Sequence, residues 1–233
     1  MIAAVPPDWH VFASPGTLAD HLADAVAAAL AGAIARRGAA FLALSGGTTP
    51  KRFLAALSGR NLEWNRVTVT LVDERFVPET SPRSNAALVR AALLAGAAAA
   101  ARFVPLYGPA ADVEAAAGIA DAALAALPRP LDVVVLGMGT DGHTASFFPD
   151  ATDAAALDPA NPAAIVAVHA ESAGEPRLTL TLPRLAEARL VVLHIEGAEK
   201  RAVLEKALST APGLPVRRVF DHAAHPVQVY WAP

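Results

Sequence analysis

The sequence predicts an α/β fold with a largely parallel central sheet and helices on both of its faces. Alanine- and leucine-rich segments with helical spacing alternate along the chain with short, β-branched apolar runs, which is typical of βαβ units. The runs Val133–Leu136 and Val191–Ile195 are apolar at nearly every position, as expected for strands that are covered on both faces.

Five segments carry apolar residues at helical spacing, and we expect a helix in each. They are Gly16–Arg37, Thr49–Leu57, Ser84–Leu94, Asp112–Leu127 and Ala198–Leu208. Thr48 or Thr49 is expected to cap the second helix, because a threonine hydroxyl accepts from the free N–H groups at a helix start. Pro50 suits the first turn of that helix.

Eight short apolar runs are expected to form strands. They are Val11–Ala13, Ala40–Leu44, Val67–Val72, Leu131–Leu136, Ile165–Val168, Leu178–Leu182, Leu190–Ile195 and Val227–Trp231. The sequence shows no internal repeat and no clear linker. We therefore expect residues 1–233 to form a single domain.

The composition excludes several classes of protein. The chain has no cysteine, so disulfide frameworks and thiolate metal sites are excluded. It has 19 Lys and Arg against 22 Asp and Glu, without the basic stripe that nucleic-acid binding needs. The longest apolar stretches, near Ala25–Ala35 and Ala91–Ala101, are too short and too rich in alanine to span a membrane. Because the N-terminus does not resemble a signal peptide, we expect a soluble cytoplasmic protein.

Four of the expected strands run directly into polar or glycine-rich segments. In open α/β sheets, ligands bind beyond the carboxyl ends of the strands. Parallel pairing would therefore gather all four segments at one edge of the sheet. The segments are Ser45–Lys51, Asp73–Arg75, Gly137–Thr144 and Glu196–Lys200.

The first of these segments is suited to binding a phosphate. Gly46 and Gly47 allow backbone N–H groups to approach an anion closely, and the helix that follows presents the positive end of its dipole. The alternative is a tight strand–helix turn that binds nothing. A nucleotide P-loop is excluded, because no Gly-Lys-Ser/Thr follows at the required spacing.

The third segment matches a dinucleotide motif through Gly137, Gly139 and Gly142, but its context argues against that function. Pro149 follows too soon for the long helix that the motif should open, and Asp141 would lie in the turn that faces a pyrophosphate. His143 is the better candidate in this segment, because histidine titrates near neutral pH and can take a proton from water. The neighbouring Asp141 could orient it; the alternative is a structural histidine.

Two further groups of cations are candidates for binding an anion. Lys200 is expected in the first turn of a helix, where a positive charge opposes the helix dipole unless an anion offsets it; the alternative is a solvated lysine. Arg75 and Arg83 flank a proline-containing loop. Either could pair with Glu74 or Glu79, or contact a phosphate.

Taken together, six segments of the sequence resemble the glucosamine-6-phosphate isomerase/6-phosphogluconolactonase family. They are Leu44–Pro50, Val72–Pro78, Ser84-Asn85, Gly137–Pro149, Arg177–Pro183 and Gly197–Lys200. The resemblance runs in consistent order from about Phe12 to the C-terminus. Its most specific part is Thr-Asp-Gly-His-Thr-Ala-Ser with the Phe-Pro that follows.

This resemblance implies a Rossmann-like fold of the NagB/RpiA/CoA-transferase type. It also implies an ester hydrolase that converts 6-phospho-D-glucono-1,5-lactone to 6-phosphogluconate in the oxidative pentose phosphate pathway, without a metal or organic cofactor. His143 would transfer the proton, and the site would further include Asp73, Arg75 and Asp141. The expected phosphate contacts are Ser45, Gly46, Gly47, Thr48, Arg177 and Lys200. We expect a monomer or weak homodimer whose partner is the sugar-phosphate lactone, with no nucleic acid or membrane involved.

Two other functions remain open at this point. The related deaminase carries Asn-Glu-Pro at the end of the third segment, where this chain has Phe147-Phe148-Pro149. The missing glutamate favours lactone hydrolysis over deamination. A sugar-phosphate sensor without catalysis is the second alternative, although binding alone would not need the pair of His143 and Asp141.

Overall fold

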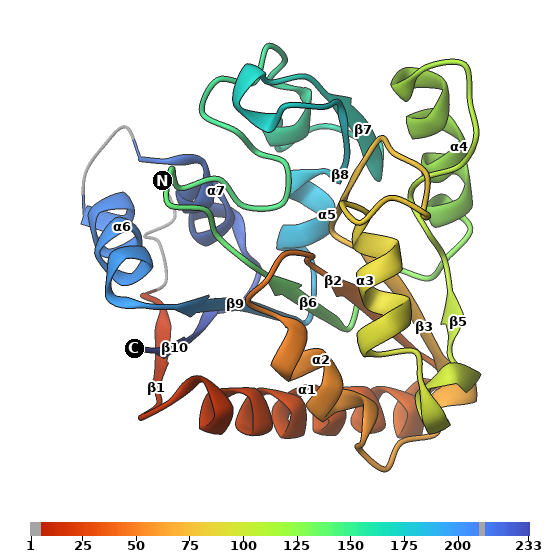
Figure 1. Cartoon of the computed structure of the whole chain (residues 1–233), viewed down its shortest axis with the longest axis vertical. Coiled ribbons are helices and arrows are strands. Elements are labelled where there is room, and N and C mark those ends of the chain that lie inside the picture. The colour runs from red at the N-terminus through yellow and green to blue at the C-terminus, as the bar shows by residue number, and fades with distance from the viewer. Residues whose placement is uncertain (1–5, 210–212) are drawn as a thin grey trace.

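The computed structural model describes residues 6–209 and 213–233, and its centre is a seven-stranded parallel sheet (Figure 1). The strand order is β1-β10-β9-β6-β2-β3-β5. The strands are β1 (Asp8–Val11), β2 (Ala40–Leu44), β3 (Val67–Leu71), β5 (Arg102–Phe103), β6 (Val133–Leu136), β9 (Leu190–Glu196) and β10 (Gln228–Ala232). All neighbours in this sheet pair in parallel, which confirms the predicted fold class.

Helices flank the sheet, with α1 and α2 below it and α5 and α7 above it in the view of Figure 1. The helices are α1 (Pro15–Arg37), α2 (Lys51–Ser58), α3 (Asn85–Ala92), α4 (Val113–Ala125), α5 (Leu182–Ala186), α6 (Ala198–Ser209) and α7 (Pro215–His222). All five predicted helices are present, with ends within two residues of the prediction. The short α5 and α7 were not predicted.

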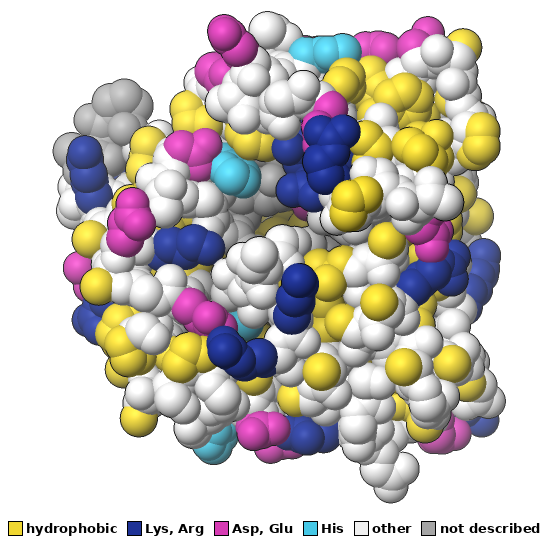
Figure 2. Space-filling view, in the orientation of Figure 1, with side chains coloured by type: hydrophobic (Ala, Val, Ile, Leu, Met, Phe, Trp, Pro, Cys, Tyr) yellow, Lys and Arg dark blue, Asp and Glu magenta, His cyan; other side chains and the backbone are white. Residues whose placement is uncertain are grey.

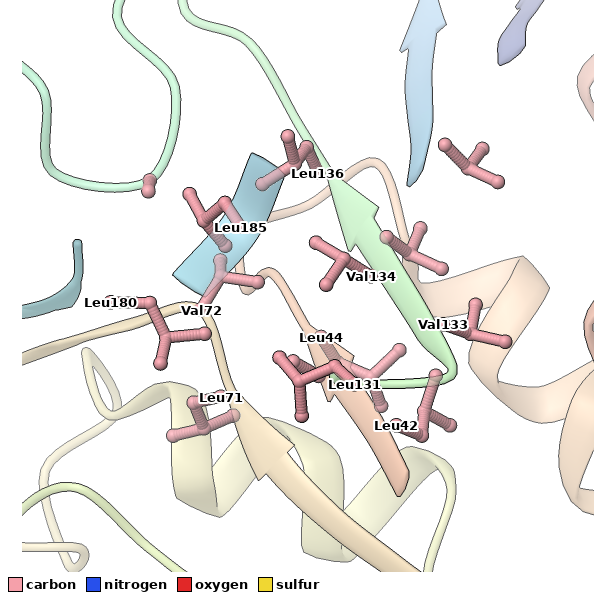
Figure 3. Packing of buried hydrophobic residues seen from close by; sticks show 14 of the residues in the cluster. Leu42, Leu44, Leu71, Val72, Leu131, Val133, Val134, Leu136, Leu180 and Leu185 are labelled. Atoms are coloured by element: carbon pink, nitrogen blue, oxygen red, sulfur yellow. The ribbon is translucent and has the colours of Figure 1, made fainter. Parts of the chain in front are cut away.

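The core lies on both faces of the sheet. Every residue of β2 and of β6 is buried, as the continuous apolar runs predicted. Figure 3 shows part of this core, in which leucines and valines from β2, β3 and β6 pack together with Leu180 and Leu185.

Helix α1 is the longest apolar element. It begins after Ser14, whose hydroxyl accepts from the Thr17 N–H, and it ends at Gly38 in the left-handed conformation (φ 78°). By length and composition alone it could cross a membrane, contrary to the expectation that no segment is long enough. However, Leu18, Leu22 and other apolar residues along it are fully buried in the core, so α1 is a partly buried core helix.

A second, three-stranded sheet was not predicted, although strands were expected at two of its three positions, Ile165–Val168 and Leu178–Leu182. It has the order β4-β8-β7 and is antiparallel, with β4 (Asp73–Arg75), β7 (Ile165–Val168) and β8 (Arg177–Leu180). The sequence predicts Asp73–Arg75 as a polar segment after a strand, but its backbone pairs with β8, because tertiary pairing outweighs low β-propensity. The register places Arg75 opposite Arg177.

Candidate active site

A cavity of about 230 Å³ lies beyond the carboxyl ends of β2, β6 and β9. Figure 2 shows this hollow, bordered by basic side chains and a histidine. Nine of the ten predicted site residues line it: Ser45, Gly46, Gly47, Thr48, Asp73, Arg75, His143, Arg177 and Lys200. The tenth, Asp141, contacts His143 instead of the cavity. Parallel pairing thus brings the four segments together as expected.

The loop from Gly46 to Thr48 presents open backbone N–H groups. Gly47 has φ 97°, a conformation that favours glycine. Among the described residues, the N–H groups of Gly46, Gly47 and Thr48 donate to no backbone carbonyl. These donors are therefore available to an anion.

The predicted threonine cap of α2 is wrong. Pro50 occupies the N-cap position, and no side chain in the described structure caps the helix. The Thr49 hydroxyl lies 3.5 Å from Lys200 Nζ, which donates to it. Because no side chain occupies the start of α2, its positive end remains open toward the cavity.

Ser45 ties the first loop to the third. Its hydroxyl accepts from the Gly137 N–H at 3.0 Å, and its own N–H donates to Val135 O at 3.0 Å. This places Ser45 in the wall of the cavity as a brace between two loops.

His143 and Asp141 form an imidazole–carboxylate pair. His143 Nδ1 lies 2.6 Å from Asp141 Oδ1, which also accepts from the His143 N–H at 3.1 Å. A carboxylate at this position favours the proton on Nδ1. The other nitrogen, Nε2, then keeps a free lone pair. The ring stacks on Phe148 with centroids 4.6 Å apart, which fixes its plane.

The glycines of the third loop allow the turn that holds His143 and Asp141 together. The Gly139 N–H donates to His143 O at 2.9 Å, and Gly142 has φ 80°. A Cβ at Gly139 would lie 2.3 Å from His143 Nδ1. After this turn the chain forms an isolated bridge between Thr144 and Phe147 and not the long helix of a dinucleotide site.

Arg75 and Arg177 bring two guanidinium groups to the cavity from paired strands. Arg177 Nη2 donates to Ala173 O at 2.8 Å, and Arg75 Nη1 donates to Arg83 O. Both Nε atoms are buried and have no hydrogen-bond partner among the described residues. Burial lowers the pKa of Arg177, and the nearby Asp73 opposes this shift. Both groups can still donate to an anionic oxygen.

The structure shows which partners Arg83, Glu74 and Glu79 have. Arg83 pairs with Glu175, and Glu79 pairs with Arg90. Glu74 is fully buried and accepts from the backbone N–H groups of Asn85 and Ala86 at 2.8 and 2.7 Å.

Lys200 lies in the first turn of α6, as predicted. It is half-buried, and this burial lowers the pKa of its ammonium group, while Glu196 and Glu199 oppose the shift. An anion in the cavity would stabilise its charged form.

Sequence reasoning missed two polar residues that line the cavity, Asn85 and His194. Both are buried, with 3% and 2% of their surface exposed. Asn85 was named from the sequence only as part of the family resemblance. Its position at the predicted start of a helix is a signal that could have identified it. His194 is a polar residue inside an apolar strand, and its Nε2 lies 3.3 Å from Glu196 Oε1.

Comparisons with known proteins show which family the chain is similar to. The profile of the family described as glucosamine-6-phosphate isomerases/6-phosphogluconolactonase matches residues 13–231. The chain is 60% identical to a 6-phosphogluconolactonase of Mesorhizobium japonicum (97% of this chain, 95% of that protein). It is 56% identical to one of Rhizobium meliloti (97% and 99%).

Solved structures show the same fold. A 6-phosphogluconolactonase from Shewanella baltica matches with a TM-score of 0.95 at 36% identity, over 99% of each chain. A monomeric glucosamine-6-phosphate deaminase matches with a TM-score of 0.76 at 18% identity, over 97% of each chain. At that identity the deaminase shows a shared fold and nothing about the reaction.

Proposed function

Since the chain belongs to the glucosamine-6-phosphate isomerase/6-phosphogluconolactonase family, we propose which residues of its cavity bind the substrate and which take part in the reaction. The reaction is the hydrolysis of 6-phosphogluconolactone to 6-phosphogluconate in the pentose phosphate pathway. The observation that carries the proposal is the pair of His143 and Asp141, which meets an open anion-binding loop at the same cavity.

The phosphate end of the substrate is held by the first loop. The N–H groups of Gly46, Gly47 and Thr48 surround the phosphate at the open start of α2. Arg177 and Lys200 supply the balancing positive charge. Binding also relieves the cost of burying these two cations.

The lactone end lies against His143. Nε2 takes a proton from a water molecule as the water oxygen attacks C1 of the lactone, and Asp141 stabilises the imidazolium that forms. When the tetrahedral intermediate collapses, the bond between C1 and the ring oxygen breaks. The imidazolium returns the proton to that oxygen, so that the open-chain acid is released and His143 is regenerated.

Arg75 is the donor to the developing oxyanion. Backbone N–H groups of the third loop are the alternative, but those of Gly137, Gly139 and Gly142 already donate to Ser45 Oγ, His143 O and Gly139 O. The Arg75 guanidinium lines the cavity, and within the described structure its one hydrogen bond runs from Nη1 to Arg83 O. One such donor contributes roughly 10²–10³-fold to the rate.

We further propose that the reaction needs no metal or organic cofactor, since the nucleophile is water and the lactone is an activated ester. The enzyme acts in the cytoplasm as a single-domain monomer or weak homodimer. Sedimentation velocity over a range of protein concentrations measures the oligomeric state. A dimer that does not dissociate on dilution would contradict the proposal.

Replacing His143 tests the proposal directly. In a coupled assay with freshly prepared 6-phosphogluconolactone, corrected for spontaneous hydrolysis, His143→Ala should lower kcat by roughly 10²–10⁴-fold with KM little changed. Lys200→Ala is the matched control, because it should mainly raise KM. Glucosamine 6-phosphate should release no ammonia.

Two results would overturn this scheme. Turnover near the wild-type value in His143→Ala would remove His143 from the reaction. A pure loss of kcat in Lys200→Ala would place the lysine at C1 and not at the phosphate.

A further inference from the structure

Asn85 is a buried amide in the wall of the cavity that the reaction above leaves without a role. It is the first residue of α3, has 3% of its surface exposed, and lines the cavity beside Gly46 and Asp73. The contacts of its side chain therefore indicate its role.

The orientation of this amide is fixed by its neighbours. Asn85 Nδ2 donates to Asp73 O at 2.9 Å and lies 3.4 Å from Asp73 Oδ1. Both partners are acceptors, so turning the amide over would place its oxygen against two other oxygens. The Asn85 Oδ1 atom therefore points away from Asp73, toward Gly46, where an added Cβ would lie 1.8 Å from it.

The backbone that carries Asn85 is also held firmly. The buried Glu74 carboxylate accepts from the Asn85 N–H at 2.8 Å, from the Ala86 N–H at 2.7 Å and from Ser84 Oγ at 3.0 Å. Ser84 in turn caps α3 by accepting from the Ala87 N–H at 3.1 Å. Asn85 is thus placed before any ligand arrives.

The hydrogen bonds of the Asn85 side chain to described residues are made by Nδ2. Its Oδ1 is not among the buried polar atoms without a partner, so this acceptor is accessible from the cavity. The cavity supplies mainly donors: the guanidinium groups of Arg75 and Arg177, the Lys200 ammonium and the N–H groups of the first loop. These suit phosphate and carbonyl oxygens, which only accept. A sugar also carries hydroxyl groups, which donate and need acceptors.

The carboxylates at the cavity already accept hydrogen bonds from the protein, unlike Asn85 Oδ1. Asp73 Oδ2 already accepts from Ser146 Oγ at 2.8 Å, and Asp141 is engaged with His143. A fully ionised phosphate cannot donate to Asn85 Oδ1. A substrate hydroxyl can.

We propose that Asn85 determines specificity, with its Oδ1 accepting a hydrogen bond from the 4-hydroxyl of the lactone. The contact with Gly46 places this oxygen beside the phosphate loop, and the 4-hydroxyl is the ring hydroxyl nearest the carbon that bears the phosphate. This inference rests on the proposed function, since it takes the lactone to be bound with its phosphate at the first loop.

The test compares kcat/KM for 6-phosphogluconolactone with that for its 2-deoxy, 3-deoxy and 4-deoxy analogues. The wild-type enzyme should prefer the parent over the 4-deoxy analogue by about tenfold or more, because a site built around a hydroxyl rejects a substrate that lacks it. In Asn85→Ala this preference should fall to about one, while the preferences at the other two positions remain.

Ser146→Ala is the matched control, because it tests whether a shift of the Asp73 side chain alone changes the preference for the 4-hydroxyl. It removes the hydrogen bond to Asp73 Oδ2 but leaves the Asn85 amide in place. It should keep the preference for the 4-hydroxyl whatever happens to its overall rate. A merely structural role for Asn85 would lower the rates of all four substrates together and leave their ratios unchanged.

Several outcomes would overturn the inference. One is a wild-type enzyme that does not discriminate against the 4-deoxy analogue, a result that needs no folded variant. Others are an unchanged ratio in Asn85→Ala, or a ratio that changes only for the 2- or 3-deoxy analogue. Failure of the proposed function looks different, since the wild type would then not hydrolyse the parent lactone or His143→Ala would remain active.

Discussion

His143 and Asp141 are only two positions apart, yet their side chains meet because Gly139 leaves room for them. An added Cβ at Gly139 would lie 2.3 Å from His143 Nδ1 and 2.5 Å from Asp141 Oδ1. Both distances are shorter than any ordinary contact, so a methyl group here must displace the pair. Gly139 is thus required by packing, not by its own backbone angles.

Gly139→Ala should therefore lower kcat, up to the roughly 10²–10⁴-fold loss expected for His143→Ala. Steady-state kinetics with 6-phosphogluconolactone measures this loss. Gly118→Ala in α4 is the control, because the Cβ it would add meets nothing within 4 Å beyond the neighbouring backbone of its own helix, and it should keep wild-type activity. Wild-type turnover in Gly139→Ala would contradict the assigned geometry.

At the level of residues, the sequence predicted functional residues that belong to a single loop better than those defined by contacts between separate loops. The two glycines, His143 and Lys200 could be recognised from their position after a strand. Asn85 could not, because its role comes from contacts with Asp73 and Gly46, which lie far from it in sequence. The roles of the ten predicted site residues remain predictions until the variants are measured.

Among the elements, β4 and the start of α3 form one unit around a buried carboxylate. Glu74 of β4 accepts from the Arg75, Asn85 and Ala86 N–H groups and from Ser84 Oγ. Burial raises the pKa of Glu74, and these hydrogen bonds oppose the increase. The carboxylate stabilises α3 at the cost of being removed from water.

This arrangement makes stability depend on pH. Because the pKa of Glu74 is raised above 4.5 in the folded state, the folded protein binds more protons than the unfolded one from pH 4.5 up to the raised value. Stability therefore falls as pH rises through that window. Glutamine does not titrate. The free energy of unfolding of Glu74→Gln, measured with urea, should therefore decrease less with rising pH over this window than that of the wild type. Equal pH slopes in the two proteins would contradict the shift.

The elements with a clear apolar period were predicted well, and those without one were not. The strands β2, β3, β6, β9 and β10 and five helices follow from their apolar residues. The two-residue β5 was not predicted, and β1 begins three residues before the expected Val11–Ala13. The antiparallel sheet was missed because β4 is a strand of charged residues, Asp73–Arg75, whose pairing with β8 depends on a segment about one hundred residues away. The five-residue α5 is too short to show a helical period.

On the scale of the whole molecule, the cavity draws residues from most of the chain. Its lining runs from Ser45 to Lys200 and includes both sheets and α6. A ligand that bridges these parts binds the folded state and not the unfolded one. Ligand binding is therefore linked to the stability of the entire fold.

The product 6-phosphogluconate should accordingly stabilise the protein, by about 2.7 kcal/mol when its concentration is 100 times its Kd. Thermal or urea unfolding followed by circular dichroism measures this. Lys200→Ala should need more product for the same effect, because it loses a phosphate contact. No change in unfolding at saturating product would contradict a binding site spread over the chain.

The pairing of β1 with β10 joins the first described strand to the last, with Asp8 opposite Gln228 and Val11 opposite Trp231. During synthesis β1 therefore has no partner strand until β10 has left the ribosome. The edge of the sheet therefore forms only once β10 is available, and a chain that lacks β10 would leave β1 without its partner strand.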